Sequence, residues 1–436
     1  MRQFNIDQLP YPKVPHFMPA NDGRVDGARL WHSLQELACI GATPQGGVRR
    51  LAFTAEDRAG RAHFVAQCRA IGMRVERDAI GNLFALTSGD TELGSIMVGS
   101  HLDTQVSGGK YDGAFGVMCA LEIARTLHER HRTLRRPFEI AVWANEEGAR
   151  FAPPMMGSGV FVERFAIDDM KAQVDASSIP LSESLAADAA LLALPYRTAR
   201  GVRAYFEPHI EQGPILEQKD VPIGIVIGAQ AVCWLDVQID GFSNHAGPTP
   251  MPMRRDALLA AAEIALAAES IALKNAPHGR ATAGQIAVTN PARNVAPGAA
   301  TLWLDLRHPD ETVLDSMIDS LSEVVVSIEA HRRVNISIDP IWRMEATQFD
   351  PTLVEALHAA ARDNGIAAID MISGAGHDAL HLALRYPAAM LFTPCEGGVS
   401  HNEAENMRSD HATLACQILY DAIEPMLTGE AVEVTQ

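Results

Sequence analysis

Features of extracellular and membrane-bound proteins are scarce in this sequence of 436 residues. The six cysteines stand singly, at Cys39, Cys68, Cys119, Cys233, Cys395 and Cys416. Such spacing excludes a dense disulfide framework and the CxxC pairs of structural zinc sites. Residues 1–17 contain no apolar core of a signal peptide, and no apolar run approaches the about 18 residues of a membrane span. We therefore expect a cytoplasmic protein without membrane contacts.

Basic residues are also in short supply. Lys and Arg total 36 against 54 Asp and Glu, which gives a formal net charge of −18, and no basic block stands out. Nucleic acid is therefore not an expected partner. The GxSxG elbow of serine hydrolases and the HExxH zinc motif are both missing from the sequence, which disfavours those two classes of enzyme.

The length and the order of the predicted elements indicate a two-domain α/β protein. Single cores rarely exceed about 250–300 residues. Apolar spacing predicts helices over 26–40, 54–71 and 114–130, and strands over 96–100 and 138–144. Strand, helix and strand at this spacing are typical of βαβ units in a parallel or mixed sheet.

A different pattern begins near residue 231. The predicted elements are strands at 234–242, 285–289, 301–306 and 335–339 and helices at 254–270 and 311–328. Together they form a compact βαββαβ-like unit. The α/β pattern then returns with helix 351–364, strand 388–393 and helix 409–426. We therefore predict a discontinuous main domain, residues 1–227 and 344–436, with an α+β unit inserted at 228–343.

Residues with metal-ligand chemistry follow the first predicted strand, in GSHLDTQVSGGKYDGAFG (99–116). His101 and Asp103 are two residues apart, so an extended backbone points both the same way. One can then bind a metal ion while the other orients it, although a surface pair is the alternative. Asp112 lies in a glycine-rich loop directly before a helix. It is either the cap of that helix or a carboxylate shared between two cations.

The next predicted strand ends in WANEEGARF (143–151), where Glu146 and Glu147 emerge from an apolar segment. Adjacent strand residues face opposite ways. One carboxylate can therefore bind metal while its neighbour acts on the attacking water, as metal-assisted hydrolysis requires. A solvated surface pair is the alternative interpretation.

Two further histidines complete the candidate set. His209, in YFEPHIEQG (205–213), shares its strand parity with Glu207 and so lies on a polar face, although a structural role is the alternative. His401 follows an apolar strand and a glycine pair in GGVSHNEAEN (397–406). Three imidazoles and two carboxylates without a thiolate form a nitrogen and oxygen ligand set that suits zinc, manganese or cobalt.

These motifs, in this order, resemble the amidase/hydantoinase/carbamoylase branch of the di-zinc aminoacylase and carboxypeptidase-like family. The resemblance covers nearly the whole chain and rests on GSHLDT, GGKYDGAFGV, NEEGARF, HIEQGPILE, HAGPTPM, RRDAL and GGVSHNEAE. It implies a di-zinc exopeptidase-like catalytic domain with a central mixed sheet flanked by helices, and makes the inserted unit a lid and dimerisation domain. A His at position 209, where exopeptidase relatives usually carry a carboxylate, favours the carbamoylase branch.

The resemblance also implies a role for each candidate in the main domain. One metal ion would be held by His101, Asp112 and His209, and the other by Asp112, Glu147 and His401. Glu146 resembles the general base, which takes a proton from water and passes it to the leaving nitrogen. Asp103 resembles the partner that orients His101.

Substrate contacts are implied mainly for the inserted unit. His245, in FSNHAGPTPM, matches a histidine that polarises the scissile carbonyl. Asn294 and Arg307 match positions that hold the substrate carboxylate, and an Arg fork suits that task. A helix-start His and an exposed strand Arg are the alternatives. Gln212, and Gly376 in SGAGHDA, also resemble substrate contacts.

The implied activity is hydrolysis of the carbamoyl C–N bond of N-carbamoyl-L-amino acids or a similar ureido acid, with release of ammonia and carbon dioxide. Allantoate or ureidoglycolate amidohydrolase is the first alternative, followed by β-ureidopropionase and by aminoacylase or peptidase. A metal-binding protein without turnover is a further alternative, against which Glu146 argues, because binding needs no extra base.

The resemblance implies two divalent ions per subunit, for which we expect zinc, with manganese, cobalt or nickel as alternatives. It also implies a small ureido or N-carbamoyl acid as the partner, and a homodimer formed through the lid. One residue departs from the pattern. Gln105 follows SHLDT where the family commonly has Val, which places an amide near the metal loop.

Overall fold

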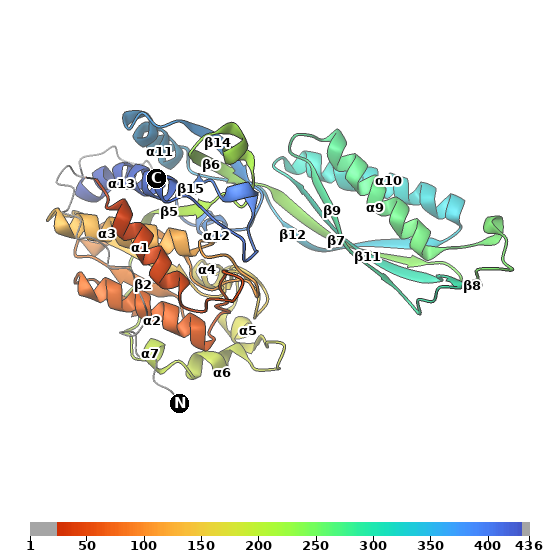
Figure 1. The fold of residues 1–436 in the computed structure, drawn as a ribbon, viewed down its shortest axis with the longest axis horizontal. Helices are drawn as coiled ribbons and strands as arrows, with labels where there is room; N and C mark the ends of the chain where they lie inside the picture. The colour runs from red at the N-terminus through yellow and green to blue at the C-terminus, as the bar shows by residue number, and fades with distance from the viewer. Residues whose placement is uncertain (1–23, 430–436) are drawn as a thin grey trace.

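The computed structural model describes residues 24–429. Residues 1–17, for which we predict no signal peptide, lie outside that range. Within it the chain forms a main body around one large sheet and a second unit at residues 231–344, which we call the lid (Figure 1). None of the helices in 24–429 combines the length and apolar character needed to cross a bilayer.

The main sheet has nine strands in the order β1-β2-β4-β3-β5-β15-β6-β13, with β14 paired to β6. Their bounds are β1 Arg74–Arg77, β2 Leu83–Leu86, β3 Ser95–His101, β4 Phe138–Trp143, β5 Val202–Ile210, β6 Ile223–Ala229, β13 Thr347–Gln348, β14 Ala368–Ser373 and β15 Ala388–Thr393. The central strands β4, β3, β5 and β15 are parallel, whereas β2 and β6 flank them in antiparallel orientation. The predicted mixed sheet is thus confirmed.

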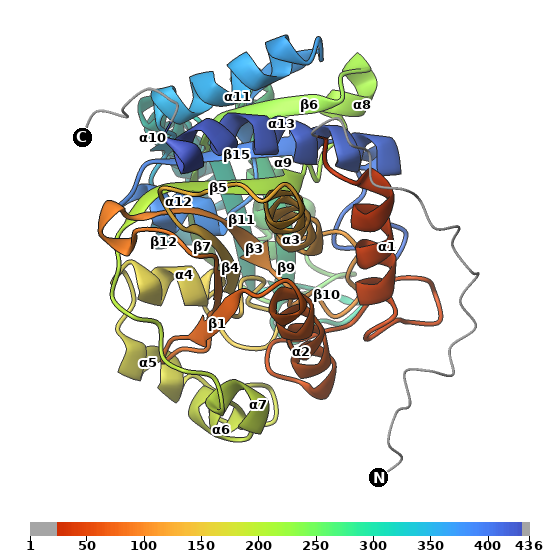
Figure 2. The ribbon, with the colours of Figure 1, turned by 90° about the vertical axis from the view of Figure 1, so that its left-hand side faces the viewer.

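Long helices cover one face of this sheet. They are α1 (Gly27–Ala38), α2 (Ala55–Ala70), α3 (Ala114–Glu129), α11 (Pro351–Asp363) and α13 (Ser409–Thr428). Figure 2 shows α1, α2, α3 and α13 on the side nearer the viewer. The Thr54 hydroxyl caps α2 by accepting a hydrogen bond from the Asp57 amide. The apolar faces of these helices share one core with the sheet.

Shorter helices lie elsewhere on the main body. α4 (Met156–Phe161) packs on β4, and α12 (Asp378–Ala383) packs on β5 and β15. The remaining ones are α5 (Ile167–Ala172), α6 (Leu181–Ala186), α7 (Ala189–Leu192) and α8 (Ile215–Lys219). A second apolar cluster fills the space between the sheet, α4 and α12, and it includes Met155 and Phe392.

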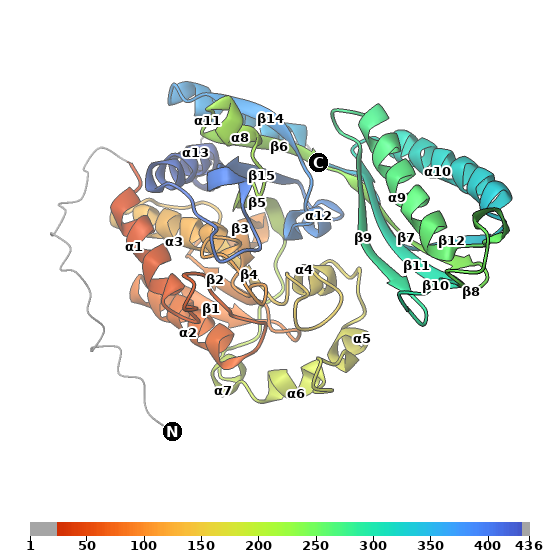
Figure 3. The same cartoon turned by 45° about the vertical axis from the view of Figure 1, so that its right-hand side comes forward.

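The lid has the βαββαβ order that its sequence predicts. Its main elements are β7 (Ala231–Asp240), α9 (Ala257–Lys274), β9 (Arg280–Val288), β11 (Ala299–His308), α10 (Glu311–Arg332) and β12 (Asn335–Met344). The sheet runs β12-β7-β11-β9, all antiparallel, and α9 and α10 cover one face around a separate core. A small ribbon of β8 (Asn244–His245) and β10 (Val295–Ala296) lies at the end of the lid farthest from the main body (Figures 1 and 3).

Candidate metal centre and cavity

Four parallel strands deliver the candidate residues to one edge of the main sheet. β3 ends at His101, the turn after β4 carries Glu146, and His209 is the penultimate residue of β5. The loop after β15 carries His401. The carboxyl ends of parallel strands meet at a common edge, which is where open α/β sheets place their sites. Residues far apart in the sequence thus meet because of strand direction.

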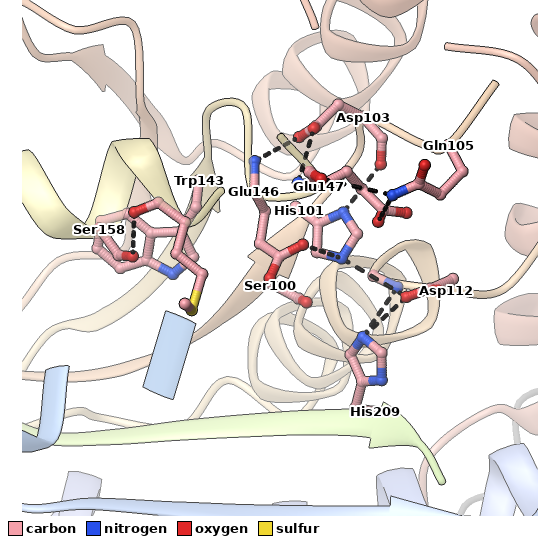
Figure 4. Close-up of polar contacts among 12 residues, drawn as sticks. Ser100, His101, Asp103, Gln105, Asp112, Trp143, Glu146, Glu147, Ser158 and His209 are labelled. Atoms are coloured by element: carbon pink, nitrogen blue, oxygen red, sulfur yellow. Dashed lines mark hydrogen bonds and ion pairs between the residues drawn. The ribbon is translucent and has the colours of Figure 1, made fainter. Parts of the chain in front are cut away.

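Asp112 lies at the centre of this edge, between two groups of ligands. Its Oδ1 atom is 3.1 Å from Nε2 of His209 and 3.6 Å from Nε2 of His101. Its Oδ2 atom is 3.3 Å from Nε2 of His401, which in turn lies 3.3 Å from Oε2 of Glu147. The two oxygens of one carboxylate therefore face different partners, which is the arrangement that a bridging ligand needs. Figure 4 shows Asp112 between His101 and His209.

The donors fit divalent cations of borderline character. The first group is His101, Asp112 and His209, and the second is Asp112, Glu147 and His401; within each group the donor atoms lie within 4.8 Å of one another. Imidazole nitrogen and carboxylate oxygen suit zinc, manganese, cobalt and nickel. Although burial opposes ionisation, hydrogen bonds from the three histidines hold the pKa of Asp112 well below its usual range. Asp112 is thus a carboxylate and ready to bind a cation.

Asp103 supports the site in a way that differs from the sequence expectation. Nδ1 of His101 lies 2.9 Å from the main-chain carbonyl of Asp103, so this residue orients His101 through its backbone. The Asp103 carboxylate instead accepts hydrogen bonds from the amides of Glu146 and Glu147, both at 3.2 Å. The Asp103 carboxylate thereby fixes the turn that presents both glutamates.

Glu146 lies beside the first ligand group and is buried. Its Oε2 atom is 3.5 Å from Nε2 of His101. Burial raises the pKa of its carboxyl well above the usual range, the Asp378 and Glu147 carboxylates add to this rise, and His101 opposes it. A glutamate with a raised pKa at the edge of a metal site is suited to accept a proton and to return it.

Gln105 contacts a candidate ligand directly. Its Nε2 atom donates a hydrogen bond of 2.8 Å to Oε2 of Glu147 (Figure 4). The departure from the family pattern therefore supports the second ligand group, since an amide donor fixes the direction of the Glu147 carboxylate.

The glycine-rich loop is held by residues that the sequence did not single out. Glu405 is buried, and its Oε1 atom accepts hydrogen bonds from the amides of Tyr111 and Asp112. Ser400 donates to Asp112 and lies 3.0 Å from the other Glu405 oxygen. A Cβ at Gly113, where φ is +63°, would lie 2.4 Å from the His101 ring. Both Gly113 and Glu405 stand within quoted motifs, but only their long-range contacts assign the roles.

His377 and Asp378 were also missed, although they directly follow Gly376. The His377 ring meets the His209 ring edge-on, with centroids 4.5 Å apart. Both residues are buried, and neither Nε2 of His377 nor the Asp378 carboxylate has a hydrogen-bond partner in the described chain. Buried polar groups of this kind are costly away from functional sites. Their short HD motif carries no periodic signal by which the sequence could reveal them.

A cavity of about 230 Å³ opens over the metal centre, between the main body and the lid. It is lined by the five candidate ligands, Glu146, and three of the predicted substrate contacts: Gln212, Arg307 and Gly376. Gln212 donates to Oδ2 of Asp112 at 2.8 Å. Arg307 reaches across from the lid, where its Nη1 atom donates to the Gly374 carbonyl at 2.5 Å.

His245 and Asn294 are not brought to this cavity within the chain. His245 forms part of β8, where it pairs with Val295 of β10, and Asn294 directly precedes that strand. This ribbon lies at the end of the lid away from the main body (Figure 3). The two predicted lid contacts are therefore separated from Arg307, which the same unit does deliver.

Comparison with known proteins agrees with the geometry. A model of peptidase family M20/M25/M40 matches residues 97–424. An N-carbamoyl-L-amino-acid amidohydrolase from Rhizobium meliloti is 38% identical over 95% of this chain and 99% of that protein. An allantoate amidohydrolase from Bacillus subtilis (strain 168) is 33% identical over 89% of this chain and 95% of that protein.

A solved structure adds the same result at the level of the fold. A hydantoinase/carbamoylase family amidase from Burkholderia ambifaria has 46% sequence identity and a TM-score of 0.86, covering 95% of this chain and 99% of that one. The family resemblance predicted from the motifs is confirmed by these matches. The chain thus belongs to peptidase family M20/M25/M40.

Proposed function

We propose that this protein is a metal-dependent amidohydrolase that cleaves the carbamoyl C–N bond of N-carbamoyl-L-amino acids. The observation that carries this proposal is the position of Asp112, whose two oxygens face separate ligand groups while Glu146 lies beside one of them. An N-carbamoyl-L-amino-acid amidohydrolase is also among the relatives that match over almost the whole chain.

The ligand groups support a proposal of two divalent ions per subunit, with zinc as the first expectation and manganese, cobalt and nickel as alternatives. Bound divalent ions acidify water and withdraw charge from a carbonyl oxygen. The chain's own contribution is to fix the donors before the substrate arrives. Asp103 does so for the glutamate turn, and Glu405 for the Asp112 loop.

Glu146 carries the proton in the proposed reaction. It takes a proton from the attacking water, whose oxygen forms a bond to the carbamoyl carbon. It then passes this proton to the departing nitrogen as the first C–N bond breaks. The carbamic acid that remains loses carbon dioxide, which breaks the second C–N bond. The overall products are ammonia, carbon dioxide and the free amino acid. The raised pKa of the Glu146 carboxyl favours the uptake of the proton, and the return step regenerates the base.

Arg307 is the proposed receptor for the substrate carboxylate, because it places a guanidinium at the lid side of the cavity. Gln212 and the backbone at Gly376 line the cavity on the side of the main body, where they can contact the ureido group. The Arg307 guanidinium and the proposed metal centre line the same cavity. Together they suit an acid whose carbamoyl group is a short distance from its carboxylate.

His245 and Asn294 require a further step to take part. Since their ribbon lies away from the cavity, either the lid moves or a second copy of the chain supplies them. The second route is the proposed homodimer, which would form through the lid. In the proposed domain division, the inserted domain is 228–343, and the catalytic domain consists of 1–227 and 344–436. Mixing the His245→Ala variant with the Glu146→Gln variant tests this second route. If each chain supplies His245 to the site of its partner, activity returns only in mixed dimers.

Ammonia release by the metal-reconstituted enzyme tests the proposal. The panel should contain N-carbamoyl-L-amino acids, β-ureidopropionate and allantoate. We expect the N-carbamoyl-L-amino acids to give the highest kcat/KM, and Arg307→Ala to raise KM for them. Faster release from allantoate would favour the second candidate, allantoate amidohydrolase, which the Bacillus subtilis relative supports. Release from no member of the panel would reject the proposal.

A further inference from the structure

The lid presents an ordered set of side chains to the cavity from three neighbouring strands. Strand pairing aligns Arg307 of β11 with Val232 of β7, and Val232 with Met344 of β12. The next row consists of Asp305, Trp234 and Trp342. Directly opposed residues in antiparallel strands point to the same face. Five of these six side chains, all but Asp305, line the cavity over the metal centre.

Trp234 and Trp342 form an aromatic pair within this set. Their ring centroids are 4.7 Å apart at an interplanar angle of 43°. Trp234 keeps 40% of its surface exposed, although it belongs to a well-ordered sheet. An exposed tryptophan that lines a cavity marks a place where an apolar group can be buried.

A single carboxylate joins the aromatic pair to the proposed carboxylate receptor. Oδ2 of Asp305 accepts hydrogen bonds of 2.7 Å from the Trp234 indole N–H and from Nη2 of Arg307. Oδ1 of Asp305 accepts a second bond of 2.7 Å from Nε of Arg307. The indole and the guanidinium are therefore held side by side. An acid whose carboxylate lies on Arg307 has its side chain next to Trp234.

The cavity offers little to a polar side chain at this place. Among residues 24–429, the side chains that the lid contributes to the lining carry only three polar groups: the Arg307 guanidinium and the indole N–H groups of Trp234 and Trp342. The Trp234 N–H is already bonded to Asp305. The main body adds Pro154 and Met155 to the apolar lining. A second ureido group buried here would leave donors and acceptors unpaired, which disfavours its binding.

We propose that this aromatic wall is the side-chain subsite of the enzyme and that it selects N-carbamoyl-L-amino acids with a large apolar, above all aromatic, side chain. This inference rests on the proposed function and makes its substrate narrower. Asp305 is the positioning residue that sets the wall beside Arg307. Discrimination comes from apolar area buried against the two indoles.

The first test compares substrates on the unaltered, metal-loaded enzyme. N-carbamoyl-L-phenylalanine and N-carbamoyl-L-tryptophan should exceed N-carbamoyl-L-alanine in kcat/KM by about tenfold or more, and allantoate should be the poorest of the four. Ammonia release measures all of them with one assay. A kcat/KM for N-carbamoyl-L-alanine or allantoate that equals or exceeds that of the aromatic substrates would overturn the inference. This outcome can be observed with the unaltered enzyme alone.

The second test removes the wall. Trp234→Ala and Trp342→Ala should each lower kcat/KM for the aromatic substrates by about tenfold, while the alanine substrate changes by less than about threefold. Trp303→Ala is the matched control, because Trp303 shares this face of β11 but is not among the residues that line the cavity. Trp234→Leu serves if the alanine variant does not fold.

The outcomes separate the two levels of the proposal. If an N-carbamoyl-L-amino acid is hydrolysed faster than allantoate, the proposed function stands. The ratio between the aromatic and alanine substrates, in the unaltered enzyme and in the variants, then decides the inference. A uniform loss over all substrates in the Trp234 and Trp342 variants would assign these residues to the fold instead, and overturns it. Hydrolysis of no N-carbamoyl-L-amino acid rejects the function and the subsite together.

Discussion

The two ligand groups share Asp112 but differ in how deeply the protein encloses them. The side chains of His101 and His209 are only 2% and 1% exposed, whereas that of His401 is 51% exposed. His209 also packs against the His377 ring. His401 stands in a loop, in the left-handed region with φ of 52°. One group is therefore part of the core, and the other opens onto the cavity.

This difference suggests a division of work between the two groups. A buried group is preorganised by its surroundings and holds an ion with little exchange. An open group has room for substrate beside it, as catalytic metal sites require.

The largest effect is expected from Asp112→Asn, because this residue serves both groups. Both ions should be lost and hydrolysis should fall to background, since an amide supplies one neutral oxygen in place of a shared carboxylate. Elemental analysis and ammonia release check the result. Asp410→Asn, at a surface pair with Arg408, is the control. Retention of two ions in Asp112→Asn would show that the groups do not share a ligand.

Alanine substitutions of His401 and of His209, one histidine from each ligand group, should have unequal effects on metal content and stability. His401→Ala should retain one ion and a nearly unchanged Tm, because its side chain is half exposed. His209→Ala should lose the buried ion and lower the free energy of unfolding by more than about 1 kcal/mol, since it empties a buried site. Metal content and thermal unfolding distinguish the variants. Identical losses in both would remove the distinction between a core group and an open group.

Ion affinity of the open group should depend on pH. The hydrogen bond to Asp112 raises the pKa of His401 to about 9, and burial raises the pKa of Glu147 to about 7. Protonated His401 cannot bind metal, so affinity should rise by about tenfold per unit as pH increases toward 9. Competition with a chelator of known pH dependence measures this slope. A flat profile between pH 7 and 9 in the unaltered protein would contradict the account.

The smallest effect is expected for Gln105→Leu. The substitution removes the hydrogen bond that Gln105 donates to one carboxylate oxygen of Glu147, in the open group. Loss of a residue that orients a metal ligand typically lowers ion affinity by about 10–100-fold. We expect the lower end, because Gln105 is only partly buried. The rate of ion release to a chelator is the measurement, with exposed Gln218→Leu as control. Slower release would show that Gln105 opposes ion binding.

Local signals in the sequence predicted much of the fold. The apolar run at 388–393 coincides with β15, and the helix predicted at 114–130 with α3, at Ala114–Glu129. The observed start of a helix differs from the predicted one where a capping residue, and not the apolar spacing, determines the first turn. The predicted helix from 254 begins at Ala257, because Asp256 accepts a hydrogen bond from the Leu259 amide. The sequence analysis missed strand β14, because its residues, AIDMIS, do not alternate regularly between apolar and polar.

The candidate ligands could be singled out from the sequence because their motifs stand near predicted strand ends or, for Asp112, before a predicted helix, and those signals are local. Their supports could not, because they depend on pairs distant in the chain. Glu405 contacts the Asp112 amide across 293 residues, and His377, which directly precedes α12, meets His209 near the end of β5. The sequence also gave no means to place His245 at the far end of the lid, since that position follows from the length and direction of β7 and β11.

The central claim, a shared metal centre served by a separate base, is tested most directly by Glu146→Gln. Metal content and ammonia release should be measured on the same preparation of this variant and of the unaltered enzyme. The account predicts two ions per chain in both and a kcat lower by about 10²–10⁴-fold in the variant. Near-normal turnover, or a loss of ions in parallel with activity, would contradict it.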